Sequence, residues 1–256
     1  MVLPIWTPDA LQSEPSAFER ILWRCVEAQH IVATAALVDT LGEQRLLEDI
    51  LEETKPPVPP ECAPLHDLYM TPFRYGCYPN GSRFRRAGPT PGVFYASEAP
   101  TTAIIETAFH LLLFYADSPD TPFPAQPTEQ TAFDVPVKTQ AAINLTAPPF
   151  DAAGALWMHT TDYAACQALE TAAREQAVEI IRYASVRDPD HNANAAVLTC
   201  QAFAARAPTS SQSWRLWFNK AGVHALWALP NQTLSLPPEV WAHDARLDDF
   251  HWRRSS

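Results

Sequence analysis

Four side chains of this 256-residue sequence are of types that could do chemistry together: Arg83, Tyr95, Glu106 and Ser185. An arginine binds phosphate through a planar, permanently charged guanidinium. A carboxylate can stabilise positive charge that develops in a transition state. If these side chains meet in one cleft, they could bind a dinucleotide and break its glycosidic bond, with no metal ion and no covalent nucleophile.

Each of these residues also has an ordinary explanation when it is taken alone. Glu106 lies in the apolar run 104–108, where a buried carboxylate is costly unless it is paired, so it could face solvent or form a structural ion pair. Arg83 could be a surface arginine and Tyr95 a core tyrosine. No Gly-x-Ser-x-Gly elbow surrounds Ser185, which argues against a hydrolase nucleophile.

The sequence lacks the usual metal and cofactor motifs. Glu106 and His110 are four residues apart, but they are not part of a His-Glu-x-x-His frame. There is no glycine-rich dinucleotide fingerprint and no P-loop. The five cysteines are scattered and lack Cys-x-x-Cys spacing, which argues against a zinc site or a disulfide framework and favours a reducing cytoplasm. We therefore expect no metal and no bound cofactor.

The predicted elements place the four side chains on a mixed α+β framework, because strands outnumber long helices. A strand over 93–96 carries Tyr95, and the helix over 103–114 carries Glu106 and is apolar nearly all round, which predicts that it is buried. The other segments with strand or helix patterns are strands at 21–28, 132–137, 142–145, 178–185 and 195–200, a hairpin at 213–227, and helices at 40–53 and 162–177.

The charge distribution favours a small anionic ligand over nucleic acid. The net charge of −11 gives a surface that repels phosphate backbones. Four arginines nevertheless lie within residues 74–86 of a chain with only 18 Lys plus Arg, which predicts a basic pocket or, alternatively, a solvated loop. No apolar run approaches the roughly 20 residues that span a bilayer, and no signal peptide is apparent, so we expect no membrane association.

Taken in order, these motifs resemble the RES domain family, which is named for its Arg, Glu and Ser. The family pattern is Gly-[Ser/Gly]-Arg-aromatic, then Tyr-x-Ser, a glutamate eleven residues after that tyrosine, and a later Tyr-x-Ser-Val-Arg-like strand. Here these segments are 81–84, 95–97, Glu106 and 183–187. The resemblance covers roughly residues 20–230.

The resemblance implies an ADP-ribosyltransferase-like fold, with a split, mostly antiparallel β core and flanking helices around an NAD⁺ cleft. It also implies a toxin of a toxin–antitoxin pair that degrades NAD⁺ as its substrate, with phosphate or water as the acceptor. The implied partner is an antitoxin with an Xre-like DNA-binding region. Transfer of ADP-ribose to a protein or nucleotide, and a non-catalytic NAD-binding module, are the alternatives.

The resemblance also implies a role for each site residue. Glu106 would stabilise the oxocarbenium character of the ribose and hold a ribose hydroxyl. Arg83 would bind the pyrophosphate or a phosphate co-substrate. Tyr95 would pack on the nicotinamide end, and Ser185 would orient the nicotinamide or the ribose through hydrogen bonds.

Four other arginines belong to this interpretation. Arg74 and Arg24 are expected to be additional phosphate contacts. The interval between Arg83 and the strand tyrosine is a residue or two longer than usual, so Arg85 or Arg86 could be the functional arginine instead.

The chain is longer than a minimal RES domain. We expect a loosely packed N-terminal extension over 1–19, a catalytic domain over 20–230 and a C-terminal tail over 231–256. Proline-rich runs at 56–64 and 119–127 are expected to be extended connectors. The extra segments could be surfaces for an antitoxin or for a homo-oligomer.

Overall fold

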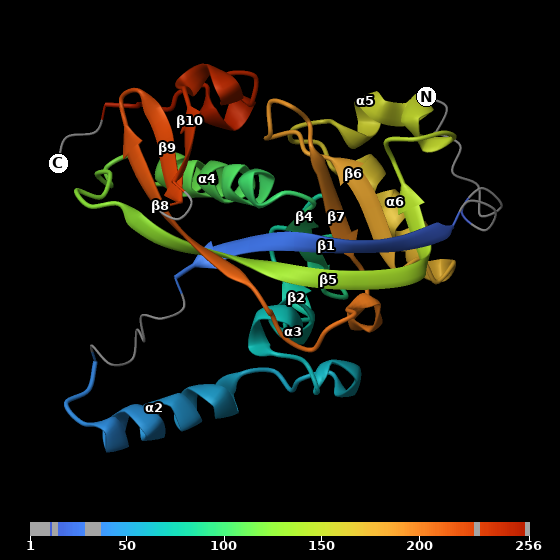
Figure 1. Ribbon diagram of the computed structural model, residues 1–256, viewed down its shortest axis with the longest axis horizontal. Helices are drawn as coiled ribbons and strands as arrows, with labels where there is room; N and C mark the ends of the chain where they lie inside the picture. Colours follow the sequence, from blue (N-terminus) through green and yellow to red (C-terminus); the bar gives the residue numbers. More distant parts are fainter. Residues whose placement is uncertain (1–10, 12–14, 29–36, 228–230, 254–256) are drawn as a thin grey trace.

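Segments with β-branched residues or with alternating apolar and polar residues form the mostly antiparallel sheet that is drawn in Figure 1. The computed structural model describes residues 11, 15–28, 37–227 and 231–253. Within these ranges the main sheet has eight strands in the order β1-β4-β7-β6-β5-β8-β9-β10, and only β5 and β6 pair in parallel. Together with its flanking helices, this sheet confirms the predicted α+β fold. The strands are β1 (Ser16–Glu27), β4 (Phe94–Ser97), β5 (Thr128–Asn144), β6 (Ile180–Ala184), β7 (Ala193–Val197), β8 (Ser211–Asn219), β9 (Gly222–Trp227) and β10 (Gln232–Leu236), with a separate pair formed by β2 (Cys77–Tyr78) and β3 (Gly88–Pro89).

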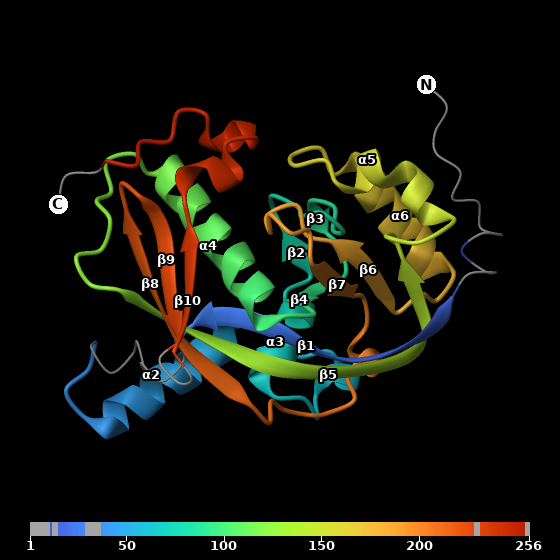
Figure 2. The same cartoon turned by 45° about the horizontal axis from the view of Figure 1, so that its top comes forward.

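Helices of very different length connect these strands, as Figure 2 shows. The predicted helix over 162–177 is observed two residues shorter at each end, and Asp162 still accepts a hydrogen bond from the backbone of Ala164 at 2.9 Å. No helix in the described ranges is long and apolar enough to cross a membrane. The α-helices are α2 (Leu41–Thr54), α3 (Asp67–Arg74), α4 (Pro100–Asp117), α5 (Gly154–Trp157) and α6 (Ala164–Glu175), and the 3₁₀ helices are η2 (Pro60–Cys62), η3 (Phe150–Ala153), η4 (Cys200–Ala202), η5 (Pro238–Trp241) and η6 (Ala245–Leu247).

Two long strands, β1 and β5, pair with each other and connect β4, β7 and β6 to β8, β9 and β10. They pair from Phe18 opposite Thr139 to Glu27 opposite Gln130, and β1 also meets β4 at one point. These contacts close a ring of five strands, β1-β4-β7-β6-β5. β8 pairs with the first half of β5, on the edge opposite β1, and β9 and β10 follow it. Residues 219–222 turn the predicted hairpin, which is confirmed as β8 and β9.

β5 corrects the prediction of separate strands at 132–137 and 142–145. It runs from Thr128 to Asn144 without a break and passes through Pro136. Proline has no N–H to donate and is tolerated where a strand has a free edge. Between its contacts with β8 and β6, the second edge of β5 pairs with no strand. Pro136 accepts a hydrogen bond there from the Ala204 N–H at 2.9 Å, so its missing N–H interrupts no strand ladder. The strand predicted at 195–200 is also displaced, because β7 ends at Val197.

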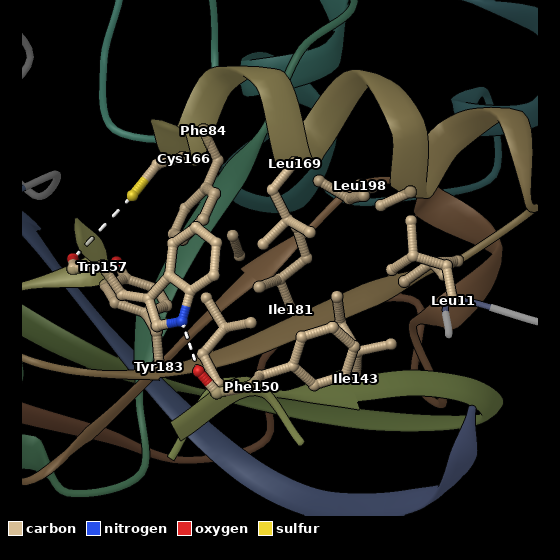
Figure 3. Close-up of a cluster of buried hydrophobic side chains, with 14 of the residues drawn as sticks. Leu11, Phe84, Ile143, Phe150, Trp157, Cys166, Leu169, Ile181, Tyr183 and Leu198 are labelled. Carbon is tan, nitrogen blue, oxygen red and sulfur yellow. Dashed lines mark hydrogen bonds between the residues drawn. The ribbon is translucent and has the colours of Figure 1, made fainter. Parts of the chain in front are cut away.

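Alternation along β4, β7 and β6 sends their side chains to two different cores. Tyr95, Ala196 and Ile181 are cross-strand neighbours on one face. That face packs against α6 and Trp157 in the cluster drawn in Figure 3, which also contains Phe84 and Tyr183. The Phe84 and Tyr183 rings meet edge to face with their centroids 4.9 Å apart. The same sheet face continues from this core toward Ser97 and Asn194.

Helix α4 is buried against the other half of the sheet, as its apolar sequence predicts. Ile104, Phe109 and Leu112 are fully buried in a cluster that includes side chains of β8, β9 and β10. Figure 2 shows α4 alongside these strands, with the C-terminal segment above it. Trp241 of that segment belongs to the same cluster and is buried. The helix is therefore held on several sides, which fixes the side chains along it.

Helix α2 is placed very differently. Thr40 and Glu43 form a capping box at its start, which explains where the helix begins and confirms the predicted helix over 40–53. None of its residues is buried, and Figure 1 shows it lying apart from the main sheet. Glu52 connects it to α3 through an ion pair with Arg74 at 2.6 Å.

The expected N-terminal extension and the expected C-terminal tail both pack with the predicted catalytic domain. β1 begins at Ser16, and Phe18 and Leu11 are buried, so these parts of the expected N-terminal extension are packed. Residues 1–10 and 12–14 of that extension lie outside the described residues. β10 and Trp241 come from the expected C-terminal tail. The boundaries at 19/20 and 230/231 stay predictions.

Candidate functional site

A cavity of about 680 Å³ lies where β1, β4 and β7 meet α4 and the turn at residues 82–85. Four of the predicted site residues line it: Arg24, Arg83, Tyr95 and Glu106. Ser185 and Arg74 do not line the cavity. The structure thus brings together residues from four separate segments of the chain, and a cavity of this size suits a small-molecule ligand.

Glu106 presents its carboxylate to this cavity from the second turn of α4. Its Oε1 atom accepts hydrogen bonds from Ser185 Oγ and from Asn194 Nδ2, both at 2.6 Å. Among the described residues, Oε2 has no hydrogen-bond partner and Glu106 forms no ion pair. The carboxylate charge is therefore held by neutral donors, and Oε2 remains available for a ligand.

The Ser185 hydroxyl contacts Glu106 and does not line the cavity. Its side chain is fully buried, and its hydroxyl donates to Glu106 while it accepts from the backbone N–H groups of Arg187 and Asp188 at 3.1 and 3.0 Å. One donor and two acceptor sites are all that a hydroxyl has. All three positions are engaged within the protein, and the hydrogen bond from Ser185 to nicotinamide or ribose stays a prediction.

The loop that carries Ser185 is fixed to the start of α4. Thr102 Oγ1 in the first turn of the helix donates to Asp188 Oδ2 at 2.7 Å, and Asn192 donates to the same oxygen at 3.0 Å. His191 Nδ1 lies 2.8 Å from the Ser185 carbonyl oxygen. These contacts hold the serine hydroxyl within hydrogen-bond distance of Glu106, although the two residues are 79 positions apart.

A rigid turn positions Arg83. Ser82 and Arg85 exchange backbone hydrogen bonds at 2.7 and 3.2 Å, and Gln167 of α6 donates to both carbonyl oxygens. The Tyr95 hydroxyl is bonded to Ser82 Oγ and to the Phe84 N–H, both at 2.8 Å. Tyr95 is therefore a support for the turn as well as part of the cavity wall, and burial raises the pKa of its hydroxyl.

The three candidate arginines of this segment, Arg83, Arg85 and Arg86, have different surroundings. Arg83 is buried, lines the cavity, donates to the Trp157 carbonyl at 2.6 Å, stacks over the Tyr163 ring and contacts the Cys166 thiol. Arg85 also lines the cavity, but its Nε and Nη2 bind Tyr75 and Thr90. Arg86 is exposed, contacts Thr171 at 3.4 Å and does not line the cavity. Arg83 therefore stays the predicted ligand contact.

Arg24 and Arg74, the two additional arginines, have opposite surroundings. Arg24 lies 4.6 Å over the Phe94 ring and donates to the Tyr95 carbonyl at 3.4 Å. Burial lowers its pKa to about 10, so it is still charged at neutral pH, and no carboxylate pairs with it among the residues that the structure describes. Arg74 is neutralised by Glu52. Arg24 is thus a half-buried cation that faces a cavity, and an anion there would neutralise it.

The C-terminal segment forms part of the cavity rim. Arg187 Nη1 binds buried Asp244 at 2.5 Å, and Arg187 Nη2 donates to the Thr160 carbonyl at 2.6 Å. Arg246 binds the same carboxylate at 2.9 Å and lines the cavity. The guanidiniums of Arg187 and Arg246 lie 4.1 and 5.2 Å from the centroid of the Phe109 ring of α4.

Sequence reasoning missed Asn194, Asp244 and Arg246. Asn194 stands in a strand whose other members are small and apolar, and a buried amide in such a strand needs partners. That mismatch is a signal that could have identified it. Asp244 and Arg246 lie in a polar segment near the end of the chain, and no local pattern there indicates that they reach the site.

The cavity combines two electrostatic environments. Arg24 and Arg83 offer donors to an anionic group, and Glu106 Oε2 offers negative charge to a group that becomes positive. Burial raises the pKa of Cys25 in the cavity wall to about 12, so this thiol stays protonated at neutral pH. Within the described ranges, no cluster of three or more His, Cys, Asp or Glu side chains could hold a metal ion.

Comparisons with known proteins agree with the motif order. No match was found among the curated proteins. The solved structure of the M. tuberculosis MbcT–MbcA toxin–antitoxin complex has 14% identity and a TM-score of 0.44, over 92% of this chain and 93% of that chain. A likeness this distant carries no conclusion about activity or partners. The model of the RES domain family matches residues 59–219, well over half of the chain and all four motif residues, so this chain belongs to the RES domain family.

Proposed function

We propose that this protein binds NAD⁺ and cleaves its nicotinamide–ribose bond. The observation that carries the proposal is the Glu106 carboxylate, which has no counter-ion among the described residues and lines the same cavity as Arg24 and Arg83. A dinucleotide matches this arrangement, because its pyrophosphate is anionic and its ribose becomes positive as the glycosidic bond breaks.

In the proposed reaction, nicotinamide leaves with the electron pair of the C–N bond. The ribose carbon acquires oxocarbenium character, and Glu106 Oε2 stabilises that charge and holds a ribose hydroxyl. The acceptor then attacks the same carbon. Phosphate gives ADP-ribose 1″-phosphate, and water gives ADP-ribose and a proton.

Binding is assigned to the arginines and to the tyrosine of β4. Arg83 would hold the pyrophosphate, and Arg24 would hold either the same group or a phosphate co-substrate. The Tyr95 ring would pack on the nicotinamide end while its hydroxyl keeps the arginine turn in place. Ser185 would contribute through Glu106.

We further propose that the protein is the toxin of a toxin–antitoxin pair, whose partner is an antitoxin with an Xre-like DNA-binding region. Membership of the RES domain family supports this role. Loss of cellular NAD⁺ would explain toxicity without a macromolecular target. An ADP-ribosyltransferase would instead need an acceptor protein or nucleotide.

Product analysis of NAD⁺ turnover, with and without inorganic phosphate, tests the proposal. We expect nicotinamide release in the absence of any protein acceptor, with ADP-ribose 1″-phosphate or ADP-ribose as the second product. Release that requires phosphate identifies a phosphorylase, and release in its absence identifies a glycohydrolase. Labelling of an added macromolecule with no turnover in phosphate or water would refute the proposal, as would binding with no turnover at all.

A further inference from the structure

A row of polar side chains crosses three strands beside the catalytic carboxylate. Ser97 of β4 is the cross-strand partner of Asn194 of β7, which is also the partner of Tyr183 of β6. Directly opposed residues in antiparallel strands project from the same face of the sheet. Asn194 is only 2% exposed, so its amide must be satisfied inside the protein.

Both ends of the Asn194 amide are engaged. Ser97 Oγ donates to Oδ1 at 2.7 Å, and Nδ2 donates to Glu106 Oε1 at 2.6 Å. Tyr183 is a further hydrogen-bond partner of this side chain. The opposite orientation of the amide would bring its oxygen to 2.6 Å from a carboxylate oxygen, which is repulsive. The direction of the amide is therefore determined by its neighbours.

Glu106 depends on this arrangement because it is anchored on a helix and not on the sheet. Its long side chain has several rotamers. Donors from β7 and from the loop after β6 converge on Oε1, so the carboxyl group is fixed by the sheet. We infer that Asn194 is a positioning residue that fixes the Glu106 carboxylate so that Oε2 faces the reacting ribose. This inference rests on the proposed cleavage of NAD⁺.

Steady-state kinetics of Asn194→Asp and Asn194→Ala separate positioning from substrate binding. We expect kcat to fall roughly 10- to 100-fold, the value of a hydrogen bond to a charged group, and KM to change less than about threefold. Asn144→Asp is the matched control, since Asn144 Oδ1 faces Arg182 and Thr146 at the end of β5 outside the cavity, and it should keep wild-type kcat and KM. An increase in KM with unchanged kcat would overturn the inference.

A double variant tests whether Asn194 acts through Glu106. In single-turnover measurements of nicotinamide release, Asn194→Ala added to Glu106→Gln should cost no more than about twofold, because residues that act as a unit are not additive. A full additional loss would overturn the inference. If the Asn194 variants unfold, Ser97→Ala, with an expected loss of about 3- to 10-fold in kcat, replaces them in the same cycle. Absence of turnover by the wild-type protein would instead refute the proposed function, and with it this inference.

Discussion

Helices α2 and α4 both combine apolar and acidic side chains, yet the structure uses them in opposite ways. The apolar residues of α4 are covered by the sheet and by the C-terminal segment, whereas Leu46, Ile50 and Leu51 of α2 are exposed. An isolated helix of 14 residues is marginal in water, so α2 depends on its capping box and on a few surface ion pairs. Helix α4 is instead a rigid support.

The difference extends to the carboxylates on the two helices. Glu52 of α2 is neutralised by Lys55 and Arg74, which lower its pKa through hydrogen bonds. Glu106 of α4 receives two hydrogen bonds from neutral groups and no counter-ion from the described residues. A carboxylate held by cations links two parts of the structure, whereas one without a counter-ion can interact with a ligand. The partners of an acidic residue therefore indicate its role better than its helix does.

The largest expected loss of stability concerns the C-terminal segment that covers α4. Asp244→Asn removes the buried partner of Arg187 and Arg246, and breaking such a pair from one side costs about 3–5 kcal/mol in free energy of unfolding. Denaturant unfolding at neutral pH measures this loss. Glu52→Gln breaks ion pairs on the exposed helix and should leave the free energy of unfolding close to that of wild type. Equal losses in the two variants would contradict the comparison.

The same pair predicts a pH dependence. Burial alone would raise the pKa of Asp244, but hydrogen bonds from Arg246 and the charge of Arg187 outweigh it and hold the pKa below the usual 3.8. A carboxyl group with a lowered folded pKa stabilises the protein above its unfolded pKa and loses that contribution as pH falls through the folded pKa. The stability difference between wild type and Asp244→Asn should therefore be constant above about pH 5 and shrink below 3.8.

The second effect is on turnover. Glu106→Gln keeps the shape of the side chain but removes its charge, and we expect nicotinamide release to slow by roughly 10²- to 10³-fold, as for loss of a principal electrostatic contact. Its thermal unfolding midpoint should stay within a few degrees of wild type. Glu52→Gln should retain full turnover. Wild-type rates in the Glu106 variant would show that the charge on α4 has no catalytic role.

The third effect compares leucines. Leu112 of α4 is fully buried, and Leu112→Ala should cost about 3 kcal/mol in free energy of unfolding. Leu46 of α2 is 60% exposed, so Leu46→Ala should change stability by no more than about 0.5 kcal/mol. Chemical denaturation of both variants in parallel checks the difference. A large loss at Leu46 would mean that a partner covers α2 under the conditions of the measurement.

The smallest effect concerns arginines. Arg24→Gln removes from the cavity a cation that no carboxylate of the described residues neutralises. We expect KM for NAD⁺ to rise by roughly tenfold with a smaller change in kcat, as for the loss of one charged hydrogen bond to a phosphate. Arg45→Gln on exposed α2 removes the same charge outside the cavity and serves as the control. An equal rise in KM for both would indicate long-range attraction instead of a contact.

Much of the fold follows from local patterns. The strand that carries Tyr95, the buried helix that carries Glu106 and the β8–β9 hairpin were predictable, because each is a short segment with its own periodicity and turn residues. The continuity of β5 through Pro136 was not predictable, since it depends on which neighbours the strand has on each edge. Pairing partners are absent from local sequence.

The candidate site also has parts that the sequence predicts and parts that it does not. Arg83, Tyr95 and Glu106 lie close together in the sequence, and the structure brings them to one cavity. The contact made by Ser185 was not predictable, because which of its possible partners the hydroxyl meets depends on the loop geometry around Asp188. Asn194 was missed for a related reason: its importance comes from the register between β4 and β7.

The pairing of β1 with β5 has a practical consequence for anyone who trims this protein. The family match begins at residue 59, so a fragment limited to 59–219 would lack β1 and Arg24. Both β4 and β5 would then present unpaired backbone, and open strand edges of this kind recruit other chains. Such a fragment should aggregate although it contains every residue of the motif. The recognisable motif is shorter than the unit that folds.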